Sequence, residues 1–239
     1  GRYAWSAAWA FMADRRGLFL RHYGAFALFA WLAYAILSWA PRYFIRVHGW
    51  TLPEAGWRFG IVYLVAGFAG AISGGVFAAW LRRRKSIDAN LRAAAWGATA
   101  IVPFAIAGPL MADPWLALAL IGVAIFFTSF PSGASVTAIS EVTPSALRGQ
   151  VSAVYYLVMS FVGLAAGPLS VALCTDYLFQ DPKRVGDSMA LVSAIVAPAA
   201  ALLLWPALPH FRRWASVGAN DAPLALQLDS GRGDSQLLN

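Results

Sequence analysis

The chain has 239 residues, of which 60% are hydrophobic and only 12% are charged, and its mean hydropathy is +0.62. A soluble globular domain contains about 45–50% apolar and about 25% charged residues, so the composition excludes that class and predicts a protein of the lipid bilayer. The formal net charge of +7 is assigned to membrane topology rather than to nucleic-acid binding, because the basic residues cluster between apolar runs. The single cysteine, Cys174, lies in an apolar run; it excludes a disulfide framework and is predicted to be a small packing residue.

Residues 1–20 mix aromatic and basic residues, among them Trp5, Trp9, Arg15 and Arg16. This stretch is too polar to cross a membrane and is predicted to be an amphipathic cytoplasmic linker helix at the membrane surface, with an unstructured linker as the alternative. The chain does not open with methionine, so we expect a fragment or a processed product.

Six candidate membrane spans follow the linker, since a spanning helix needs about 20 apolar residues. They cover 23–45 (broken near Pro41), 57–81, 91–111, 115–139, 151–178 and 188–208. The sequence therefore predicts an all-α membrane protein with one bundle of six transmembrane helices over residues 21–213. Residues 214–239 are rich in Gly, Asp and Ser and are predicted to form a disordered cytoplasmic tail.

The basic residues are distributed unequally between the two sides of this predicted topology. Most lie on the side of the chain termini, including the four consecutive residues Arg82 to Lys85. By the positive-inside rule both termini are expected in the cytoplasm, as for a multi-pass protein of a bacterial inner (plasma) membrane.

Two glycine pairs at a spacing of four residues lie inside predicted spans. Gly70 and Gly74 form one pair; Gly163 and Gly167 form the other, with Pro168 directly after it. Glycines one helical turn apart give a helix a smooth flank, so both pairs predict a closely packed neighbouring helix. Pro168 removes one backbone donor and is expected to bend its helix.

The region around the second pair resembles a known family. The order of Glu141, Pro144, Leu-Arg-Gly, a tyrosine-rich segment, Gly-x-x-x-Gly-Pro and Asp176 resembles helices ten and eleven of major facilitator superfamily transporters. Within the superfamily, GLAAGPLSVALCTD is most similar to the spinster-like branch. The segment SWAPRYFIRVHGW, residues 38–50, together with Glu-Ala-Gly at 54–56, resembles helices seven and eight of bacterial members.

A third similarity lies in a predicted cytoplasmic loop. Gly75, Arg83 and Arg84 match the superfamily loop motif, in which glycine is followed four residues later by aspartate and then by a basic cluster. Here Ala79 holds the aspartate position and Trp80 the next basic position, which is expected to weaken charge pairing of the loop. Together the resemblance covers roughly residues 5–212. It implies the C-terminal half of a transporter, helices seven to twelve, with the N-terminal six-helix half as its partner.

Polar and aromatic residues inside spans are the candidate pathway, because such groups are costly in lipid. In the first span Tyr23, Ala27, Trp31, Tyr34, Ser38 and Arg42 recur at helical spacing on one face. The alternative for aromatic residues near span ends is an interfacial belt, and for hydroxyl residues it is helix packing. The predicted substrate-pathway residues are Trp31, Tyr34, Ser38, Arg42, Phe127, Thr128, Ser132, Tyr156 and Ser160. The resemblance places helices nine and twelve, the third and sixth spans, on the outside.

The predicted gating residues lie on both sides of the loop between the fourth and fifth spans and in the fifth span. Glu141 and Arg148 flank the loop and are expected to pair with each other or with charges of a neighbouring bundle. The full set is Glu141, Arg148, Gly163, Gly167, Pro168 and Asp176. Pro131 is expected to kink the fourth span.

The sequence contains no pattern typical of an enzyme. The three histidines, His22, His48 and His210, are far apart in sequence, and neither a metal-ligand cluster nor a phosphate loop is present. No acidic residue lies in the middle of a predicted span, so a proton-coupling carboxylate is expected in the missing half. The favoured function is transport of a small amphipathic or organic solute by alternating access, without cofactors or metals, by a protein in contact with membrane lipids. The alternative is a six-span membrane protein without transport activity that acts as an assembly or regulatory partner.

Overall fold

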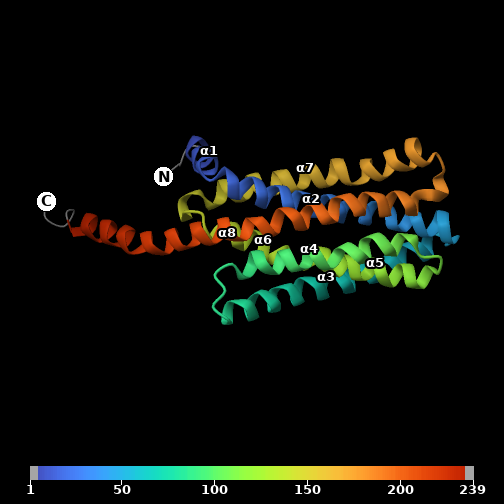
Figure 1. Cartoon of the computed structure of the whole chain (residues 1–239), viewed down its shortest axis with the longest axis horizontal. Coiled ribbons are helices and arrows are strands. Elements are labelled where there is room, and N and C mark those ends of the chain that lie inside the picture. The colour runs from blue at the N-terminus through green and yellow to red at the C-terminus, as the bar shows by residue number, and fades with distance from the viewer. Residues whose placement is uncertain (1–4, 235–239) are drawn as a thin grey trace.

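The computed structural model describes residues 5–234, with side chains described to Arg212 except that of Ala134. It is all-helical over this range (Figure 1). The α-helices are α1 (Trp5–Asp14), α2 (Arg16–His48), α3 (Leu52–Arg83), α4 (Ala89–Ala107), α5 (Pro114–Ser129), α6 (Ser132–Glu141), α7 (Arg148–Leu173) and α8 (Val185–Asp234). Short turns complete the chain: η1 (Gly108–Leu110), η2 (Ser145–Leu147), the π-helix η3 (Cys174–Phe179) and η4 (Pro182–Arg184).

Five of these helical segments are long and apolar enough to cross a membrane. They are Arg16–His48, Leu52–Arg83, Ala89–Leu110, Ser145–Phe179 and Pro182–Arg212. The predicted fourth span, 115–139, is divided: α5 ends at Ser129, and α6 begins after Pro131, which cannot donate a backbone hydrogen bond. Pro131 therefore interrupts this span more strongly than the kink that the sequence predicts, and α5 alone is a shorter apolar helix of 16 residues.

Helix boundaries follow from local chemistry. A capping box starts α3: the Glu54 amide donates to Thr51 Oγ1 at 3.4 Å, and the Thr51 amide donates to the Glu54 carboxylate at 2.9 Å. Asp113 caps α5 by accepting a hydrogen bond from the Leu116 amide at 2.7 Å. Gly49, with φ +69°, ends α2 in the left-handed conformation that glycine tolerates.

The expected break at Pro41 is wrong, because α2 continues through this residue to His48. The turns around it are held by tertiary packing: Ala40, Tyr43 and Phe44 are fully buried, and Phe44 stacks on Trp50 with ring centroids 4.4 Å apart. Burial of large aromatic rings offsets the backbone hydrogen bond that a proline removes.

Figure 1 shows the long helices running roughly side by side, so that their connections lie at two ends of the bundle. The end with the α3–α4 and α6–α7 connections also holds α1 and the cluster Arg82 to Lys85, and is called the basic end below. The far end holds the α2–α3, α4–α5 and α7–α8 connections. Residues 1–4 and 235–239, and the side chains from 213 onward, lie outside the described part. The backbone of α8 continues to Asp234, through most of the range 214–239 for which the sequence predicts a disordered tail.

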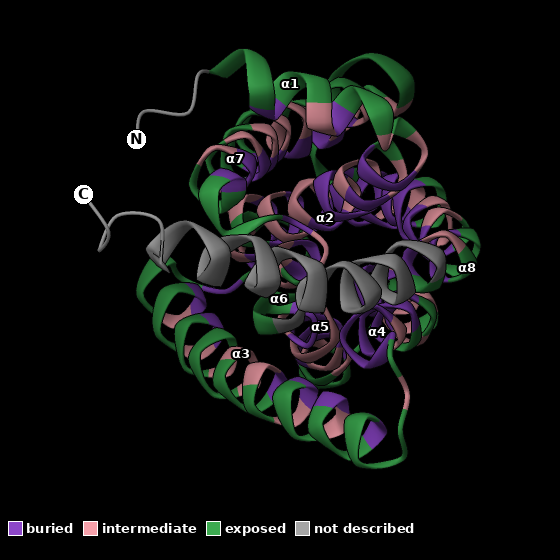
Figure 2. Ribbon diagram, turned by 90° about the vertical axis from the view of Figure 1, so that its left-hand side faces the viewer, coloured by how far each residue is buried: buried purple, intermediate pink, exposed green. Residues whose placement is uncertain are grey.

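The helices pack in pairs. α2 packs on α7 and α8, α3 on α5, and α4 on α5 and α8. In the end-on view of Figure 2, α3 and α7 lie on one side of the bundle, and α4 and α8 lie on the other. In the most apolar 18-residue window of each helix, only 17% of residues are buried in α3 and in α7, against 50% in α4 and 44% in the α8 segment. The two helices on the α3 and α7 side therefore leave most of their apolar surface uncovered.

Both glycine pairs are contact surfaces, which confirms the predicted close packing. A Cβ atom on Gly167 would lie 2.7 Å from the Trp31 carbonyl oxygen, and one on Gly163 would lie 2.5 Å from the Tyr34 ring. Gly70 and Gly74 lie against the backbone of Phe126 and Phe130. These pairs bring α7 onto α2 and α3 onto α5.

Candidate functional site: the α3–α7 face and the basic end

The exposed side of the bundle between α3 and α7, with α2 and α5–α6 between them, is called the α3–α7 face. A cleft of about 290 Å³ lies on it between α3 and the α5–α6 break. Its lining is apolar apart from a tyrosine and two serines, and comprises Tyr63, Leu64, Gly67, Phe68, Ala71, Ser129 and Ser132. The site lies at the break caused by Pro131. Because α5 ends at Ser129 and α6 begins at Ser132, two serines stand where an uninterrupted helix would pack against α3.

A tyrosine pair extends the polar character of the cleft toward α2. Tyr34 of α2 lies near Tyr63 of α3. Tyr63 is 37% exposed, while the Tyr34 ring is half-buried against Gly163. The two tyrosines therefore present amphipathic groups at the same part of the face.

Most of the predicted polar stripe of α2 packs on α7. The Tyr23 hydroxyl donates to the Val151 carbonyl at 2.8 Å, and Trp31 Nε1 donates to Ser170 Oγ at 2.9 Å. Trp39, outside the stripe, donates to the Pro168 carbonyl at 2.9 Å. Trp31 is thus a half-buried residue of the α2–α7 contact. The Pro168 carbonyl accepts a hydrogen bond across the same contact, and α7 continues past this proline to Leu173.

Other predicted pathway residues remain accessible. Ser38 is half-buried, and Arg42 is exposed with its guanidinium 5.1 Å from the Trp39 ring centroid. On α7, Tyr156 is 56% exposed, and Ser160 is exposed one turn further along. Of the predicted pathway positions, Arg42, Ser132, Tyr156 and Ser160 are exposed, and the other five are half-buried.

Phe127 and Thr128 take part in contacts within the bundle. The Phe127 ring stacks on Phe104 of α4, with centroids 6.0 Å apart, and also contacts Phe126 and Phe130. Thr128 Oγ1 donates to the Ala124 carbonyl of its own helix at 2.6 Å. Phe127 therefore fills the α4–α5 contact.

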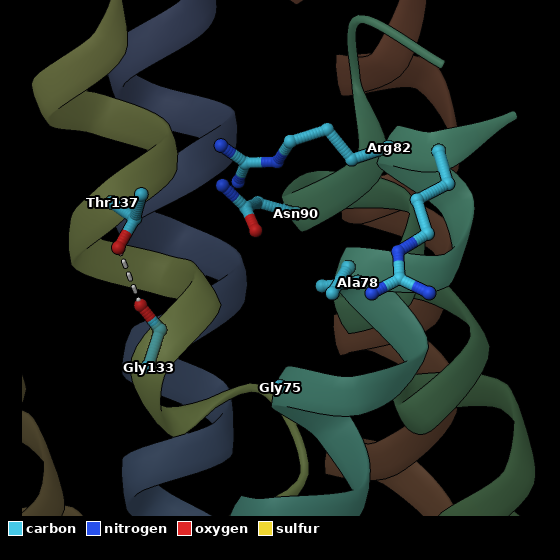
Figure 3. Close-up of a pocket in the computed structure, with 8 residues that line it drawn as sticks. Gly75, Ala78, Arg82, Asn90, Gly133 and Thr137 are labelled. Atoms are coloured by element: carbon cyan, nitrogen blue, oxygen red, sulfur yellow. Dashed lines mark hydrogen bonds between the residues drawn. The ribbon is translucent and has the colours of Figure 1, made fainter. Parts of the chain in front are cut away.

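At the basic end, a second cleft of about 520 Å³ opens between α3, α4 and α6. Figure 3 shows Arg82 and Asn90 on one side of it and Gly133 and Thr137 of α6 on the other. Glu141 joins the two sides: its Oε1 accepts a hydrogen bond from Asn90 at 3.0 Å and lies 3.5 Å from an Arg82 nitrogen. One carboxylate thereby connects the ends of α3, α4 and α6.

The expected pairing of Glu141 with Arg148 is absent. Arg148 Nε donates instead to the Thr143 carbonyl at 3.0 Å, so the arginine holds its own loop together. The Glu141 carboxylate instead contacts Asn90 of α4 and Arg82 of α3. A short offset in sequence across the Pro144 turn did not make the two charges neighbours.

The remaining predicted loop and gating residues are placed as follows. Arg83 and Gly75 line the cleft at the basic end, and the Arg84 guanidinium lies 4.0 Å from the Trp80 ring centroid. Trp80, which stands at a basic position of the loop motif, thus binds a neighbouring cation. Asp176 lies exposed in the π-helix η3 at the far end.

Asp88 is a charged residue of the basic end that sequence reasoning missed. It is only 2% exposed, and its carboxylate accepts hydrogen bonds from Ser86 at 2.7 Å and from Arg212 Nε at 2.8 Å, with Arg92 at 3.5 Å. Burial alone would raise the pKa of Asp88, but the hydrogen bonds from Ser86 and Arg212 and the two arginine charges outweigh it and lower that pKa. The network ties the start of α4 to α8.

Three other residues of these sites were also missed: Tyr63, Ser129 and Asn90. Tyr63 lies mid-span and Asn90 just before an apolar run, so the rule that polar residues in or beside spans are functional would have selected both. Their partners, on distant parts of the chain, could not be identified from spacing. Among the described residues, no group of three His, Cys, Asp or Glu side chains could hold a metal ion.

Comparison with known proteins agrees with this architecture. The sequence profile described as Major Facilitator Superfamily matches residues 2–168. No match was found among curated proteins.

Two solved structures are similar in fold, both of a bacterial homolog of the human lysosomal transporter Spinster in an inward-facing conformation. The unoccupied form has a TM-score of 0.62 at 18% identity and the occupied form 0.59 at 17%, covering 90% and 84% of this chain. This chain spans 50% and 49% of theirs, so it corresponds to about half the length of each. The profile match covers most of the chain, and five helices are apolar and long enough to cross a membrane. The chain is therefore a multi-pass membrane protein that belongs to the major facilitator superfamily.

Proposed function

We propose that the chain acts as the C-terminal half of a secondary active transporter that moves a small amphipathic or organic solute by alternating access. In such folds the solute site lies near the bilayer midplane between two bundles. The proposal counts α5 and α6 together as one interrupted span, which gives six spans. It also takes residues 1–20 as the linker from the preceding half, 21–213 as the bundle and 214–239 as a tail.

The observation that carries this proposal is the α3–α7 face. Apolar side chains on it are 57% to 68% exposed: Leu64 and Phe68 of α3, which line the cleft, and Leu157 of α7. The cleft also contains hydroxyl groups. Hydroxyls facing lipid are unfavourable, whereas they suit a water-accessible pathway. A second six-helix bundle placed on this face would cover the apolar rims and leave the cleft as one wall of a cavity.

The lining favours an amphipathic solute. Tyr34, Tyr63 and Tyr156 offer ring faces together with hydroxyl groups, and Arg42 at the far end of α2 offers a cation. Such a surface can bind an apolar body and a polar or anionic head. The proposed activity is transport rather than catalysis.

The basic end is assigned to the cytoplasm, because it carries Arg82 to Lys85 and Arg148. This places both termini inside, as expected for a bacterial inner-membrane protein. The contact of Glu141 with Arg82 and Asn90 would then lie at the inner gate. Partly exposed pairs of this kind are weak, so they can break and form as the bundles rock.

The test is reconstitution in liposomes. The chain alone, and the chain coexpressed with the N-terminal six-helix half that the proposal assigns as its partner, are assayed for uptake of lysolipids and organic anions. We expect saturable flux only from the coexpressed pair, because one bundle provides only one wall. Flux from the chain alone would contradict the half-transporter assignment, and no flux from a correctly assembled pair across the panel would contradict the proposed substrate class.

A further inference from the structure

His22 is a fully buried polar residue that belongs neither to the proposed solute pathway nor to the proposed inner gate. Its side chain is 0% exposed, and neither Nδ1 nor Nε2 has a hydrogen-bond partner. Arg58 and Arg92 also leave Nε without a partner, but each guanidinium reaches a carboxylate through another nitrogen. Among the described side chains with such unpaired atoms, only His22 makes no hydrogen bond of ordinary geometry through any of its atoms.

The imidazole lies where α2, α6 and α7 meet, near the basic end. Its ring centroid is 4.7 Å from that of Phe26, 5.9 Å from Tyr155 and 6.0 Å from Tyr23. The backbone of Ser135 of α6, a residue 3% exposed, lies beside the ring without forming a well-aligned hydrogen bond. This meeting point of the three helices is called the His22 seam.

The charged groups near the seam have other partners. Tyr23 donates to the Val151 carbonyl, and the Arg21 guanidinium donates to the Gly17 carbonyl at 3.2 Å. On α8, His210 Nδ1 is 3.0 Å from the Pro206 carbonyl; on α6, Glu141 contacts Arg82 and Asn90; on α1, Asp14 pairs with Arg15. No described carboxylate lies within ion-pair distance of His22.

The packed seam is therefore a costly environment for this residue. A neutral imidazole always carries one donor and one acceptor, and each buried group without a partner costs about 1–3 kcal/mol. An imidazolium without a counter-ion or water would cost much more. Protonation must therefore favour an arrangement in which the ring reaches water or a new partner.

We propose that His22 is a proton-binding site whose protonation opens the seam between α2, α6 and α7 at the basic end. The site is specified by geometry: a titratable ring enclosed by aromatic side chains at the junction of three helices. This proposal concerns the conformation of the bundle and does not require that the bundle transports a solute. If it does, the opening would admit water beside the α6–α7 loop and make the inner gate sensitive to cytoplasmic pH.

The size of the effect follows from linkage. A water-exposed imidazole has a pKa of about 6.5, so in the open state at pH 5 the ratio of protonated to neutral imidazole is about 30. If the closed seam does not accept the proton, lowering the pH from 8 to 5 raises the open-to-closed ratio by about 30-fold. Replacing the imidazole with a ring that cannot be protonated removes this factor.

The experiment measures access to Ser135 in the purified full-length protein that contains this chain, in a Cys174→Ser background. Ser135→Cys is reacted with a polar thiosulfonate reagent between pH 5 and pH 8. Each rate is divided by that of Ser145→Cys, an exposed loop position, which corrects for the pH dependence of the thiolate. We expect the corrected rate to rise about 30-fold at pH 5, to become independent of pH in His22→Phe, and to retain its rise in the matched control His210→Gln.

A second measurement covers the case in which Ser135→Cys does not fold. The Tm of the protein with native Ser135 should fall between pH 8 and pH 5 by more than that of His22→Phe, because only the native seam must exclude a protonated ring. His22→Gln, which keeps a polar group but does not titrate, should behave as His22→Phe. The proposal would be overturned if the corrected rate or the Tm had the same pH dependence with His22, with His22→Phe and with His22→Gln. This outcome does not depend on whether liposome flux is observed.

Discussion

Replacing Gly167 with alanine should separate α7 from α2. The new Cβ atom would lie 2.7 Å from the Trp31 carbonyl oxygen, 3.0 Å from the Ala35 amide nitrogen and 3.1 Å from Tyr34 Cβ. Two of these three atoms are backbone, so no side-chain rotation relieves the overlap and the helices must move apart. Overpacking of this kind costs about 1–3 kcal/mol, which in a domain of this size lowers Tm by roughly 2–4 °C for each kcal/mol.

Two matched variants make the prediction quantitative. In Gly163→Ala the closest atoms belong to the Tyr34 ring, which can rotate, so a smaller loss is expected. In Gly149→Ala the new Cβ meets nothing within 4 Å, so no loss is expected. The assay is size-exclusion chromatography of heated full-length protein in detergent, which yields Tm for each variant. Equal Tm values for Gly167→Ala and Gly149→Ala would refute the close α2–α7 contact.

Two further predictions concern the basic end. Asp88→Asn should lower the free energy of unfolding by about 1–3 kcal/mol at neutral pH, because the Arg212 and Arg92 charges lose their partner. Since the pKa of Asp88 lies below its usual value, the stabilisation is complete above about pH 4 and is lost as the pH falls through the folded-state pKa. Tm curves of the two proteins against pH should therefore converge in acid, and a constant difference down to pH 2 would contradict this assignment. Glu141→Gln loses the ion pair with Arg82 but retains an acceptor for Asn90, so Tm should change little and the uptake rate should change by up to about fivefold. Arg148→Lys should leave uptake near the native rate, because Arg148 contacts only its own loop through the Thr143 carbonyl. Uptake that depends on Arg148 and not on Glu141 would reverse the assignment of the gate.

The spans and the glycine contacts could be predicted because they depend on local properties of the chain. Hydropathy over about 20 residues locates a buried or lipid-facing helix, and a glycine pair produces a flat surface whatever packs on it. Both Gly70/Gly74 and Gly163/Gly167 indeed lie at helix contacts. The exact effect of prolines was harder to predict: α2 continues through Pro41, whereas Pro131 separates α5 from α6. The turn after Pro41 carries the fully buried rings of Tyr43 and Phe44, whereas Ser132 and Gly133, which follow Pro131, are exposed. Sequence alone does not show which of these turns is packed.

The candidate site was predicted less completely, because periodicity identifies which residues share a helical face but not what that face contacts. The predicted stripe contains Tyr23 and Trp31, and both of these residues donate hydrogen bonds to α7. Tyr63 and Ser129 belong to the cleft only because α3 packs on α5. In the same way Glu141 contacts Asn90, 51 positions away, and not the arginine next along the loop.

The central claim, that the α3–α7 face is one wall of a solute pathway, is tested most directly by comparing two surfaces that are both exposed in this bundle. In the full-length protein without Cys174, cysteine is placed at Tyr63 and Ser132 on that face and at Leu202 of α8, which is 72% exposed on the other side. Each variant is treated in proteoliposomes with a membrane-impermeant thiol reagent, with and without a transported solute. The account predicts labelling of Tyr63→Cys and Ser132→Cys that the solute slows, and no labelling of Leu202→Cys, which faces lipid. Labelling of Leu202→Cys together with unreactive Tyr63→Cys and Ser132→Cys would contradict it.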